Sequence, residues 1–327
     1  MKTGNKELYN NDEIMSKRYL YWLMVLISGL LASCDPDKVD ELNFDVAVRN
    51  NLQEVYVGDE VIFDFGGNPD YIIFYSGENG KKYVNKDRLN VEVESMSLSY
   101  TIKQQYTNVA YQNRETMQIC ISTDFNGVYT SDAIEKATWT KVSGAGDGQL
   151  MVPTCSGKNS ETVSDEGDLS AYKDKKFYLA FRYQTPAVLD LEYNQPRVDV
   201  EPLALTKKVD GGTVVMSNPS KEFGFNYVFV KGNSQNNFST NDSRLLFQPQ
   251  NTWKVEVDVW AISQQLDITA VSPDQGEPIK SLDMKSPSYS YRYNTPGEYV
   301  VTFVALNANM WNSESMVREL KIIVKEK

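Results

Sequence analysis

The sequence predicts an all-β protein built from two β-sandwiches, and three observations support that fold class. From Phe44 onward, short apolar runs alternate with polar residues at the two-residue period of a β-strand, and Gly, Asn, Asp or Pro bounds each run. The period of a helix is not maintained beyond about three turns anywhere in the chain. Without a predicted leader of 33 residues, 327 − 33 = 294 residues remain, which is enough for two cores at ~100 to 200 residues per domain.

The clearest strands lie near the two ends of the chain. Val55–Val57 and Val61–Phe65 alternate about a Gly-Asp turn, and Tyr71–Tyr75 is a nearly continuous apolar run that predicts a buried strand. Residues 299–305 and 320–324 each place alternate apolar side chains on one face. These five segments predict paired strands that pack around a core.

The middle of the chain continues this pattern. Strands are predicted within residues 91–102, 117–122, 137–142, 177–183, 225–230 and 253–262. Residues 132–136 fit a single helical turn. The polar segments 144–148 and 156–167 predict long loops, which in a sandwich are where ligands or metals are held.

The N-terminal segment has the order of a secretory signal that ends at a lipidation site. Lys17 and Arg18 precede the mostly apolar run 19–31, and Ala32-Ser33-Cys34 follows it. A basic flank, a short apolar core and small residues before a cysteine are what lipoprotein processing requires. The run is shorter than the ~20 residues that span a bilayer, so a retained transmembrane helix is the weaker interpretation. We expect residues 1–33 to be the signal peptide.

After processing, Cys34 is expected to carry acyl chains, and residues 34–41 to form a polar tether. A tether of this kind anchors a soluble body at a membrane surface through lipid alone. The chain carries 33 Lys and Arg against 44 Asp and Glu, for a net charge of −11. This acidity gives no general attraction to nucleic acid or anionic lipid, so we expect no nucleic-acid partner and membrane contact through the lipid anchor only.

The absence of histidine narrows the catalytic classes. Ser-His-Asp and Cys-His catalysis and histidine-ligated zinc are excluded because the sequence has 0 His. Of the cysteines, Cys120 and Cys155 remain after Cys34 is lipidated, and an exported protein can join two cysteines in a disulfide. Cys120 lies in the apolar run Gln118–Ile121, where cysteine often serves as a small hydrophobe, so both alternatives stay open.

The segment Tyr293-Asn294-Thr295-Pro296-Gly297-Glu298-Tyr299-Val300-Val301-Thr302, followed by Asn307, resembles the C-terminal half of polycystic-kidney-disease-type (PKD) domains, which are immunoglobulin-like (Ig-like) β-sandwiches. The resemblance implies that Tyr299 leads a strand at a corner of the sandwich, with its ring in the core and its hydroxyl bonded to the backbone. Those domains usually carry a Trp-Asp-Phe-Gly-Asp-Gly-like turn shortly before this segment. Here it is echoed only far upstream, in residues 74–80.

The resemblance and the lengths together suggest a discontinuous domain. Residues 42–86 number 45 and residues 263–327 number 65, and each is short beside the ~100 residues of a seven-stranded sandwich. We infer that they form one Ig/PKD-like sandwich, with residues 87–262 inserted at an exposed loop. The alternative is two small Ig-like pieces that flank a separate domain.

Within the insert, residues 121–127, 137–142 and 168–172 with 178–183 resemble jelly-roll domains of bacterial adhesins and carbohydrate-binding modules, which have a galactose-binding-like fold. The mature chain as a whole resembles Bacteroidetes outer-membrane lipoproteins of unknown-function type that accompany SusC/SusD-like glycan importers, in the SusE-like position. This resemblance implies a lipid-anchored location at the cell surface of the outer membrane, a glycan ligand and SusC/SusD-like partners.

Exposed aromatic rings and amides are the residues that a glycan site requires. Trp311 is the first candidate, because it lies between two predicted strands in a loop that also contains Asn309 and Asn312. A tryptophan folded back over its own hairpin is the alternative. Trp260 is the second candidate, because strand parity places it on the polar face opposite Trp253, where it offers a sugar platform or packs against the neighbouring sandwich.

Two acidic groups are weak calcium candidates. Asp124 with Asn126, and Asp165 with Asp168, supply oxygen ligands, but neither group has the complete twelve-residue spacing of a calcium loop. An Asx turn explains the first group and a solvated loop explains the second. We therefore expect no cofactor, with a structural calcium ion as the alternative.

These observations predict a non-catalytic cell-surface lipoprotein that binds an oligo- or polysaccharide for a SusC/SusD-like uptake system. The alternative is a surface adhesin or envelope assembly protein that binds another protein. No Asp or Glu lies in a recognisable catalytic motif, so a glycosidase that uses paired carboxylates is the least favoured class.

Overall fold

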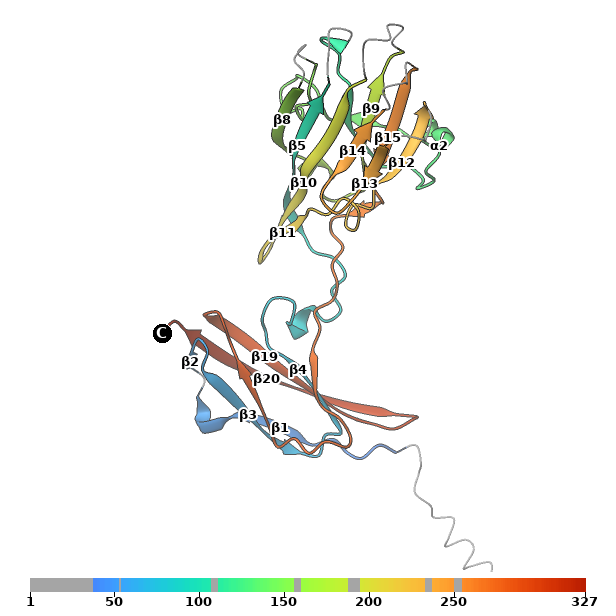
Figure 1. Cartoon of the computed structure of the whole chain (residues 1–327). Coiled ribbons are helices and arrows are strands. Elements are labelled where there is room, and N and C mark those ends of the chain that lie inside the picture. Colours follow the sequence, from blue (N-terminus) through green and yellow to red (C-terminus); the bar gives the residue numbers. More distant parts are fainter. Residues whose placement is uncertain are drawn as a thin grey trace, which may run out of the picture. The chain divides into compact units, whose positions relative to one another are not determined.

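The computed structural model describes residues 38–52, 54–106, 111–155, 160–187, 195–232, 237–249 and 255–327. Cys34, the predicted signal peptide and Trp253 lie outside the described residues. The described part is nearly all strand, so the predicted all-β fold class is confirmed. The chain divides into two compact units (Figure 1). Unit 1 combines the N-terminal part up to Asp87 with Pro273–Lys327, and unit 2 is Arg88–Ser272.

Unit 1 is a β-sandwich of a three-stranded and a five-stranded sheet. The first sheet has the order β1 (Phe44–Val48), β3 (Glu60–Gly67), β18 (Ser288–Arg292). The second has the order β17 (Glu277–Lys280), β4 (Tyr71–Tyr75), β19 (Gly297–Ala308), β20 (Ser313–Lys325), β2 (Glu54–Tyr56). Each sheet therefore combines strands from both ends of the chain. Two 3-10 turns, η1 (Arg49–Asn51) and η2 (Tyr83–Asn85), lie between strands.

The core of unit 1 is aromatic. The ring of Phe303 on β19 lies 5.0 Å from Phe63 of the facing sheet and 5.2 Å from Phe74 of the neighbouring strand, measured between ring centroids. The predicted alternation along residues 299–305 is confirmed, because Tyr299, Val301, Phe303 and Ala305 are all buried. Period-two burial along β19 thus brings the C-terminal segment into the same core as β3 and β4.

The corner that the PKD resemblance implied is also confirmed. Tyr299 is buried, and its hydroxyl donates to the carbonyl oxygen of Thr295 at 2.9 Å. The neighbouring Tyr293 stacks on Tyr299 with 4.3 Å between ring centroids, and its hydroxyl donates to the carbonyl oxygen of Ser76 at 2.8 Å. This second bond ties the turn after β4 to the segment before β19, across more than two hundred residues of sequence.

Unit 2 is a larger sandwich of two six-stranded sheets. The first has the order β13 (Asn237–Thr240), β14 (Leu245–Gln248), β10 (Arg197–Val209), β5 (Val93–Gln105), β8 (Ser160–Asp168), with β11 (Gly212–Met216) beside β10. The second has the order β12 (Asn226–Lys231), β15 (Val257–Ile262), β9 (Lys176–Thr185), β6 (Met117–Ser122), β7 (Thr140–Lys141), with β16 (Leu266–Asp267) beside β9. A short helix, α2 (Ser131–Lys136), fits the predicted helical turn, and η4 (Ser170–Tyr172) follows β8.

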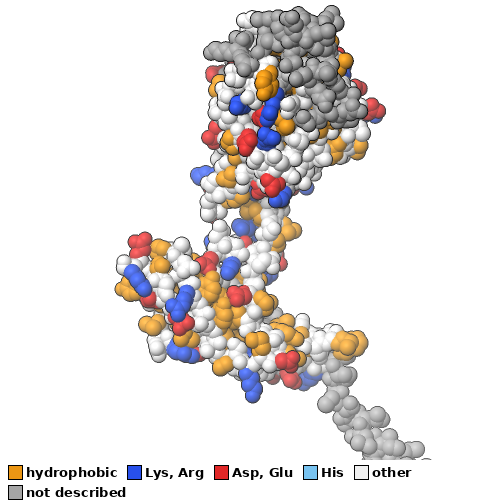
Figure 2. Space-filling view, in the orientation of Figure 1, with side chains coloured by type: hydrophobic (Ala, Val, Ile, Leu, Met, Phe, Trp, Pro, Cys, Tyr) orange, Lys and Arg blue, Asp and Glu red, His pale blue; other side chains and the backbone are white. Residues whose placement is uncertain are grey.

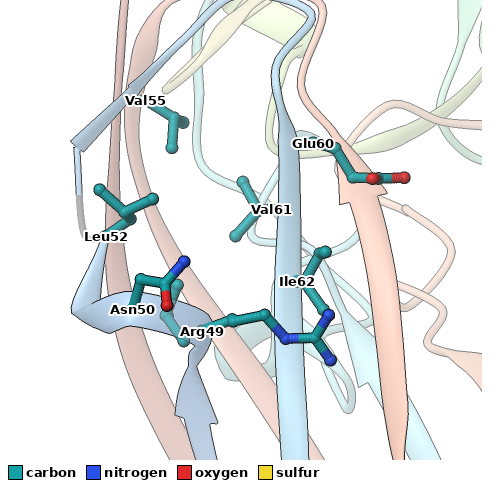
Figure 3. A pocket seen from close by; sticks show the side chains of 8 residues that line it. Arg49, Asn50, Leu52, Val55, Glu60, Val61 and Ile62 are labelled. Carbon is teal, nitrogen blue, oxygen red and sulfur yellow. The ribbon is translucent and has the colours of Figure 1, made fainter.

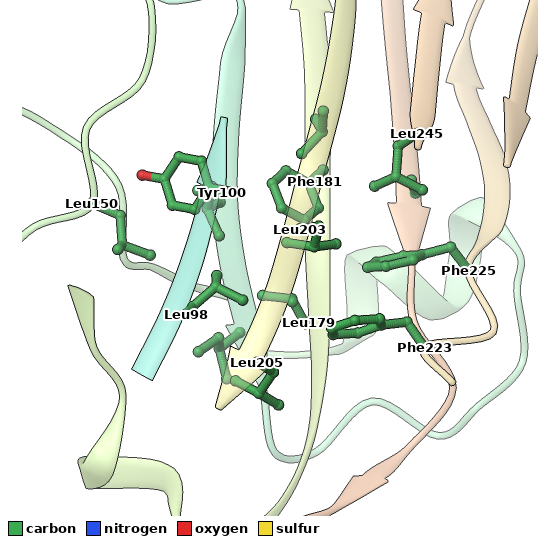
Figure 4. Packing of buried hydrophobic residues seen from close by; sticks show 14 of the residues in the cluster. Leu98, Tyr100, Leu150, Leu179, Phe181, Leu203, Leu205, Phe223, Phe225 and Leu245 are labelled. Carbon is green, nitrogen blue, oxygen red and sulfur yellow. The ribbon is translucent and has the colours of Figure 1, made fainter. Parts of the chain in front are cut away.

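The main core of unit 2 lies between these sheets, where Leu98, Leu203 and Phe181 are among the buried side chains (Figure 4). Leu266 and Ile268 belong to the same core, and Leu266 pairs with Phe177 of β9. Residues 263–272 consequently belong to unit 2, although the sequence placed them in the other sandwich. The unit ends ten residues later than predicted because β16 returns to the edge of β9.

The predicted loop over residues 156–167 is wrong, because β8 occupies residues 160–167 of it and pairs along β5 from Ser160 to Asp168. Its alternate residues are only half buried and mostly polar, so no hydrophobic period marks it as a strand. The strands β10, β11, β13, β14, β17 and β18 were also not predicted from the pattern.

Replacement of Tyr293 by Phe is expected to destabilise unit 1 by about 1 to 2 kcal/mol, because the carbonyl oxygen of Ser76 loses its buried donor. Urea denaturation followed by near-ultraviolet circular dichroism measures the change. Tyr56→Phe is the matched control, since Tyr56 is 50% exposed and its variant should unfold like the unmodified chain. Equal midpoints for the two variants would contradict the role given to the Tyr293 hydroxyl.

Candidate functional site

The structure brings Trp311, Asn309 and Asn312 together in the turn that joins β19 to β20. The side-chain oxygen of Asn309 accepts from the backbone N–H groups of Trp311 and Asn312, both at 2.8 Å. The indole of Trp311 is 66% exposed and Met310 beside it is 86% exposed. Trp311 is therefore not folded back over its hairpin. The turn presents an aromatic face on a protruding tip, and the oxygen of Asn309 serves the turn itself.

The structure corrects the role expected for Trp260, which is only 5% exposed. Its ring lies 5.0 Å from that of Trp139, and the guanidinium carbon of Arg182 stands 4.9 Å from its centroid. Strand parity correctly put Trp260 on the face of β15 that points away from the main core. The segment that contains α2 covers that face and forms a second apolar cluster within unit 2. Trp260 thus offers no open surface to a sugar, and its packing is within its own unit.

Arg182 and Asp258 form an ion pair at the edge of this second cluster. Two guanidinium nitrogens of Arg182 donate to the carboxylate of Asp258, at 2.9 and 2.6 Å. Asp258 is buried, and a buried carboxylate without a partner would be strongly unfavourable, so the ion pair with Arg182 compensates its charge. The hydrogen bond to Asp258 raises the pKa of Arg182, and the contact with Trp260 covers one face of the guanidinium.

Cys120 and Cys155 are free, buried thiols, so the disulfide is absent from the structure. Burial raises the pKa of Cys120 to about 11. Cys155 accepts a hydrogen bond from Gln104 at 2.6 Å, and burial also raises its pKa. Neither thiol has the lowered pKa and exposure of a reactive cysteine.

The first pair of calcium candidates is used within a turn. The carboxylate of Asp124 accepts from the backbone N–H of Thr138 and from the hydroxyl of Ser122, both at 2.8 Å. Hydrogen bonds from Thr138 and then Ser122 lower the pKa of Asp124. The side-chain oxygen of Asn126 accepts from the N–H of Val128, which is an Asx turn.

The second pair is separated by strand geometry. Asp165 and Asp168 are three residues apart on β8, so their side chains point to opposite faces of the sheet. Asp165 accepts from the N–H of Met151, and Asp168 accepts from the hydroxyl and N–H of Ser170. Within the described residues, no group of three or more Cys, Asp or Glu side chains is arranged to hold a metal ion.

The sequence did not point to an ion network on the outer face of unit 2. Two nitrogens of Arg197 donate to the carboxylate of Asp199, at 2.8 and 2.9 Å, and Arg244 donates to the same carboxylate at 3.2 Å. Asp199 is buried, whereas both arginine side chains are partly exposed. Figure 2 shows basic and acidic side chains side by side on the face of unit 2 that carries β10 and β5.

An exposed aromatic ring lies beside this network. Arg197 is paired in register with Gln105, and the next residue, Tyr106, is 49% exposed. The hydrogen bond to Asp199 raises the pKa of Arg197, and the hydroxyl of Tyr106 adds to that rise through its charge interaction. We refer to Tyr106, Arg197, Asp199 and Arg244 as the arginine–tyrosine site. Arg197 and Asp199 lie two residues apart and so share one strand face, which is a signal that the sequence contains. Arg244 lies directly before β14, and no sequence pattern links it to Asp199.

Unit 1 contains a small pocket between η1 and β3 (Figure 3). Its lining consists of Val48, Arg49, Asn50, Leu52, Val55, Glu60, Val61 and Ile62. The floor is apolar, and Arg49 on the rim is paired with Asp64 through two hydrogen bonds of 3.0 and 2.5 Å. Asp64 thus pairs with Arg49, and the rest of the lining is apolar apart from Asn50 and Glu60.

The fold and these sites define an all-β, two-unit protein whose accessible chemistry is aromatic rings, guanidinium groups and amides. The family model described as "Domain of unknown function (DUF5017)" matches residues 33–225, which is more than half of the 327-residue chain. The chain belongs to this family. No curated protein matches it. Among the described residues, no helix is long and apolar enough to cross a membrane.

Among solved structures, the chain was matched to winged bean acidic lectin complexed with methyl-α-D-galactose. The sequences are 11% identical, the alignment covers 70% of this chain and 95% of the lectin, and the TM-score is 0.11. A superposition of this quality supports no argument about fold or ligand.

Replacement of Trp260 by Ala is expected to destabilise unit 2 by about 3 to 5 kcal/mol, because it opens a cavity beneath Arg182 and Trp139. Chemical denaturation followed by circular dichroism measures this loss. The exposed Trp311→Ala should leave the midpoint within about 0.5 kcal/mol of the unmodified chain. A Trp260→Ala protein of unchanged stability would contradict the buried position.

Alkaline pH is expected to destabilise unit 2 through Cys120. Because burial raises its folded-state pKa to about 11, the protonated thiol contributes stability that is present below the unfolded-state pKa near 9 and is lost as pH rises to about 11. Between pH 8 and pH 11 the unmodified chain should lose on the order of 2 kcal/mol more than Cys120→Ala. Parallel pH profiles of the free energy of unfolding for the two proteins would contradict this assignment.

Proposed function

We propose that this protein is a non-catalytic, lipid-anchored protein of the outer-membrane surface that binds an oligo- or polysaccharide for a SusC/SusD-like uptake system. The observation that carries the glycan part is the arginine–tyrosine site. There the exposed Tyr106 follows the strand position paired with Arg197, and a buried carboxylate holds the guanidinium groups of Arg197 and Arg244 in place. The predicted signal peptide and Cys34 support the location.

The chemistry of this site suits a sugar. The ring of Tyr106 can cover the C–H face of a pyranose, and its exposure leaves that face accessible. A guanidinium carries five N–H donors, and Asp199 receives only two hydrogen bonds from Arg197, so further donors remain for sugar oxygens. Because Asp199 orients both arginines before a ligand arrives, little side-chain entropy is lost on binding.

The neighbouring surface suits an extended chain. On the outer face of β5 and β8, the hydroxyl groups of Thr101 and Ser164 are hydrogen-bonded at 2.8 Å, and Ser97 donates to Glu166 at 2.8 Å. These pairs put three hydroxyl groups, of Ser97, Thr101 and Ser164, on the face beside the arginine–tyrosine site. A polysaccharide can lie along such a face while one residue stacks on Tyr106.

Affinity electrophoresis of the full mature chain against a panel of polysaccharides tests the proposal. At least one glycan should retard the protein, and Tyr106→Ala should weaken that binding by about 1 to 2 kcal/mol, because the aromatic platform is lost. Arg197→Gln should weaken it as well, since Asp199 then loses its bidentate partner. Tyr56→Ala, which removes an exposed ring from unit 1, is the control and should bind normally. A folded protein that no glycan retards would refute glycan binding.

A second candidate function is adhesion to another protein, and β11 favours it. Val214 and Val215 are adjacent residues on this strand and both are about half exposed, at 49% and 52%. β11 pairs only with β10, so its other edge is open to a partner strand within the described structure. Capture of one envelope protein by the unmodified chain, and its loss in Val214→Lys, would support this function over glycan binding.

A further inference from the structure

The tip of the β19–β20 hairpin places two large apolar side chains next to each other in solvent. Met310 is 86% exposed and Trp311 is 66% exposed. In the space-filling view, the end of this hairpin carries hydrophobic surface (Figure 2). Single exposed apolar residues are common on proteins, but an adjacent Met and Trp at a protruding turn combine the side chains that favour an apolar phase and a membrane interface.

The hairpin holds this tip firmly. Residues of β19 and β20 pair without interruption from Gly297 opposite Val324 to Ala308 opposite Ser313. Beyond the last pair, the N–H of Asn309 donates to the carbonyl oxygen of Asn312 at 2.9 Å. Three backbone N–H groups of this convex turn, those of Asn309, Trp311 and Asn312, are bonded within it, and the side chains of Met310 and Trp311 project into solvent. This shape suits a deformable apolar phase better than a sugar.

The N-terminal segment enters unit 1 beside this tip. Asn307 on β19 donates from its side chain to the carbonyl oxygen of Asp40 at 3.3 Å, and Glu314 on β20 accepts from the N–H of Leu42 at 2.9 Å. Asn307 and Glu314 stand directly opposite each other in the hairpin. The first described residues thus contact the hairpin only three positions before Met310.

Chain lengths put the tip within reach of the lipid anchor. Asp40 comes six positions after Cys34, and a fully extended segment of six residue steps spans at most ~21 Å. The tip extends only about 10 Å beyond Asn307 at the rise of a strand. An acylated Cys34 therefore keeps the hairpin end of unit 1 close to the bilayer.

We propose that Met310 and Trp311 insert into the interfacial region of the bilayer that holds the acyl chains of Cys34. The inference rests on the lipid anchor of the proposed function. The ligand is a zwitterionic lipid surface, because the residues beside the tip include the acidic Asp40, Glu41 and Glu314 and give no attraction for anionic headgroups. Two attachment points, the lipid and the tip, fix the orientation of unit 1 on the membrane, whereas a lipid alone leaves it free to turn.

The test uses the full lipidated chain, extracted from cells and reconstituted into phosphatidylcholine vesicles that contain brominated phosphatidylcholine, a quencher of tryptophan fluorescence. The unmodified chain should show a quenched component that disappears in Trp311→Phe. Met310→Asp keeps the fluorophore but puts a charge at the tip, and it should reduce that quenching by at least about half. Tyr56→Asp is the matched control, since Tyr56 is exposed and pairs with Lys325 at the other end of β20. Its quenching should equal that of the unmodified chain.

The outcomes separate this inference from the proposed function. A chain that does not float with the vesicles lacks the lipid anchor, and the insertion is overturned together with that part of the proposed function. A chain that floats without quenching of Trp311 overturns insertion alone. Quenching that persists in Trp311→Phe does not come from Trp311 and overturns the insertion as well. A loss of glycan retardation in Trp311→Phe, together with no quenching of the unmodified chain, assigns the tip to the glycan site and also overturns the insertion.

Discussion

The register of β19 is the constraint on which unit 1 depends. Its alternate residues from Tyr299 to Ala305 enter the core, so a slip of one position would turn these apolar side chains out of the core. The same strand pairs with β4 on one side and with β20 on the other. Through these pairings a C-terminal strand brings the N-terminal segment into one sheet, and it also sets the direction of the hairpin tip.

Unit 2 follows a different rule, because its second sheet is covered on both faces. Along β15 every residue from Val257 to Ile262 is buried, so alternation of polarity no longer separates inside from outside. One face meets the main core and the other meets the segment around α2. One consequence is the buried arrangement of Trp260, Asp258 and Arg182. A strand face with charged residues becomes internal when the charges pair and an aromatic ring packs over the cation.

The two proposed interaction sites lie in different units and use different chemistry. The arginine–tyrosine site is a set of oriented donors around a buried carboxylate, which suits a ligand rich in oxygen. The hairpin tip has two apolar side chains on a convex turn, which suits a lipid interface. In the surface lipoprotein that we propose, the first site would recognise the ligand and the second would control how the body is presented.

The sequence by itself determined the all-β class and the sharing of one face by residues 299–305, because these depend on local period. The corner at Tyr299 followed from the resemblance of its segment to PKD domains. The sequence also placed Trp311 with Asn309 and Asn312 between two strands. The polar strand β8, the burial of Trp260 and the meeting of Arg244 with Asp199 required the tertiary structure. Each of them depends on which strand face a distant segment packs against. The period of a single strand does not show which segment packs on it.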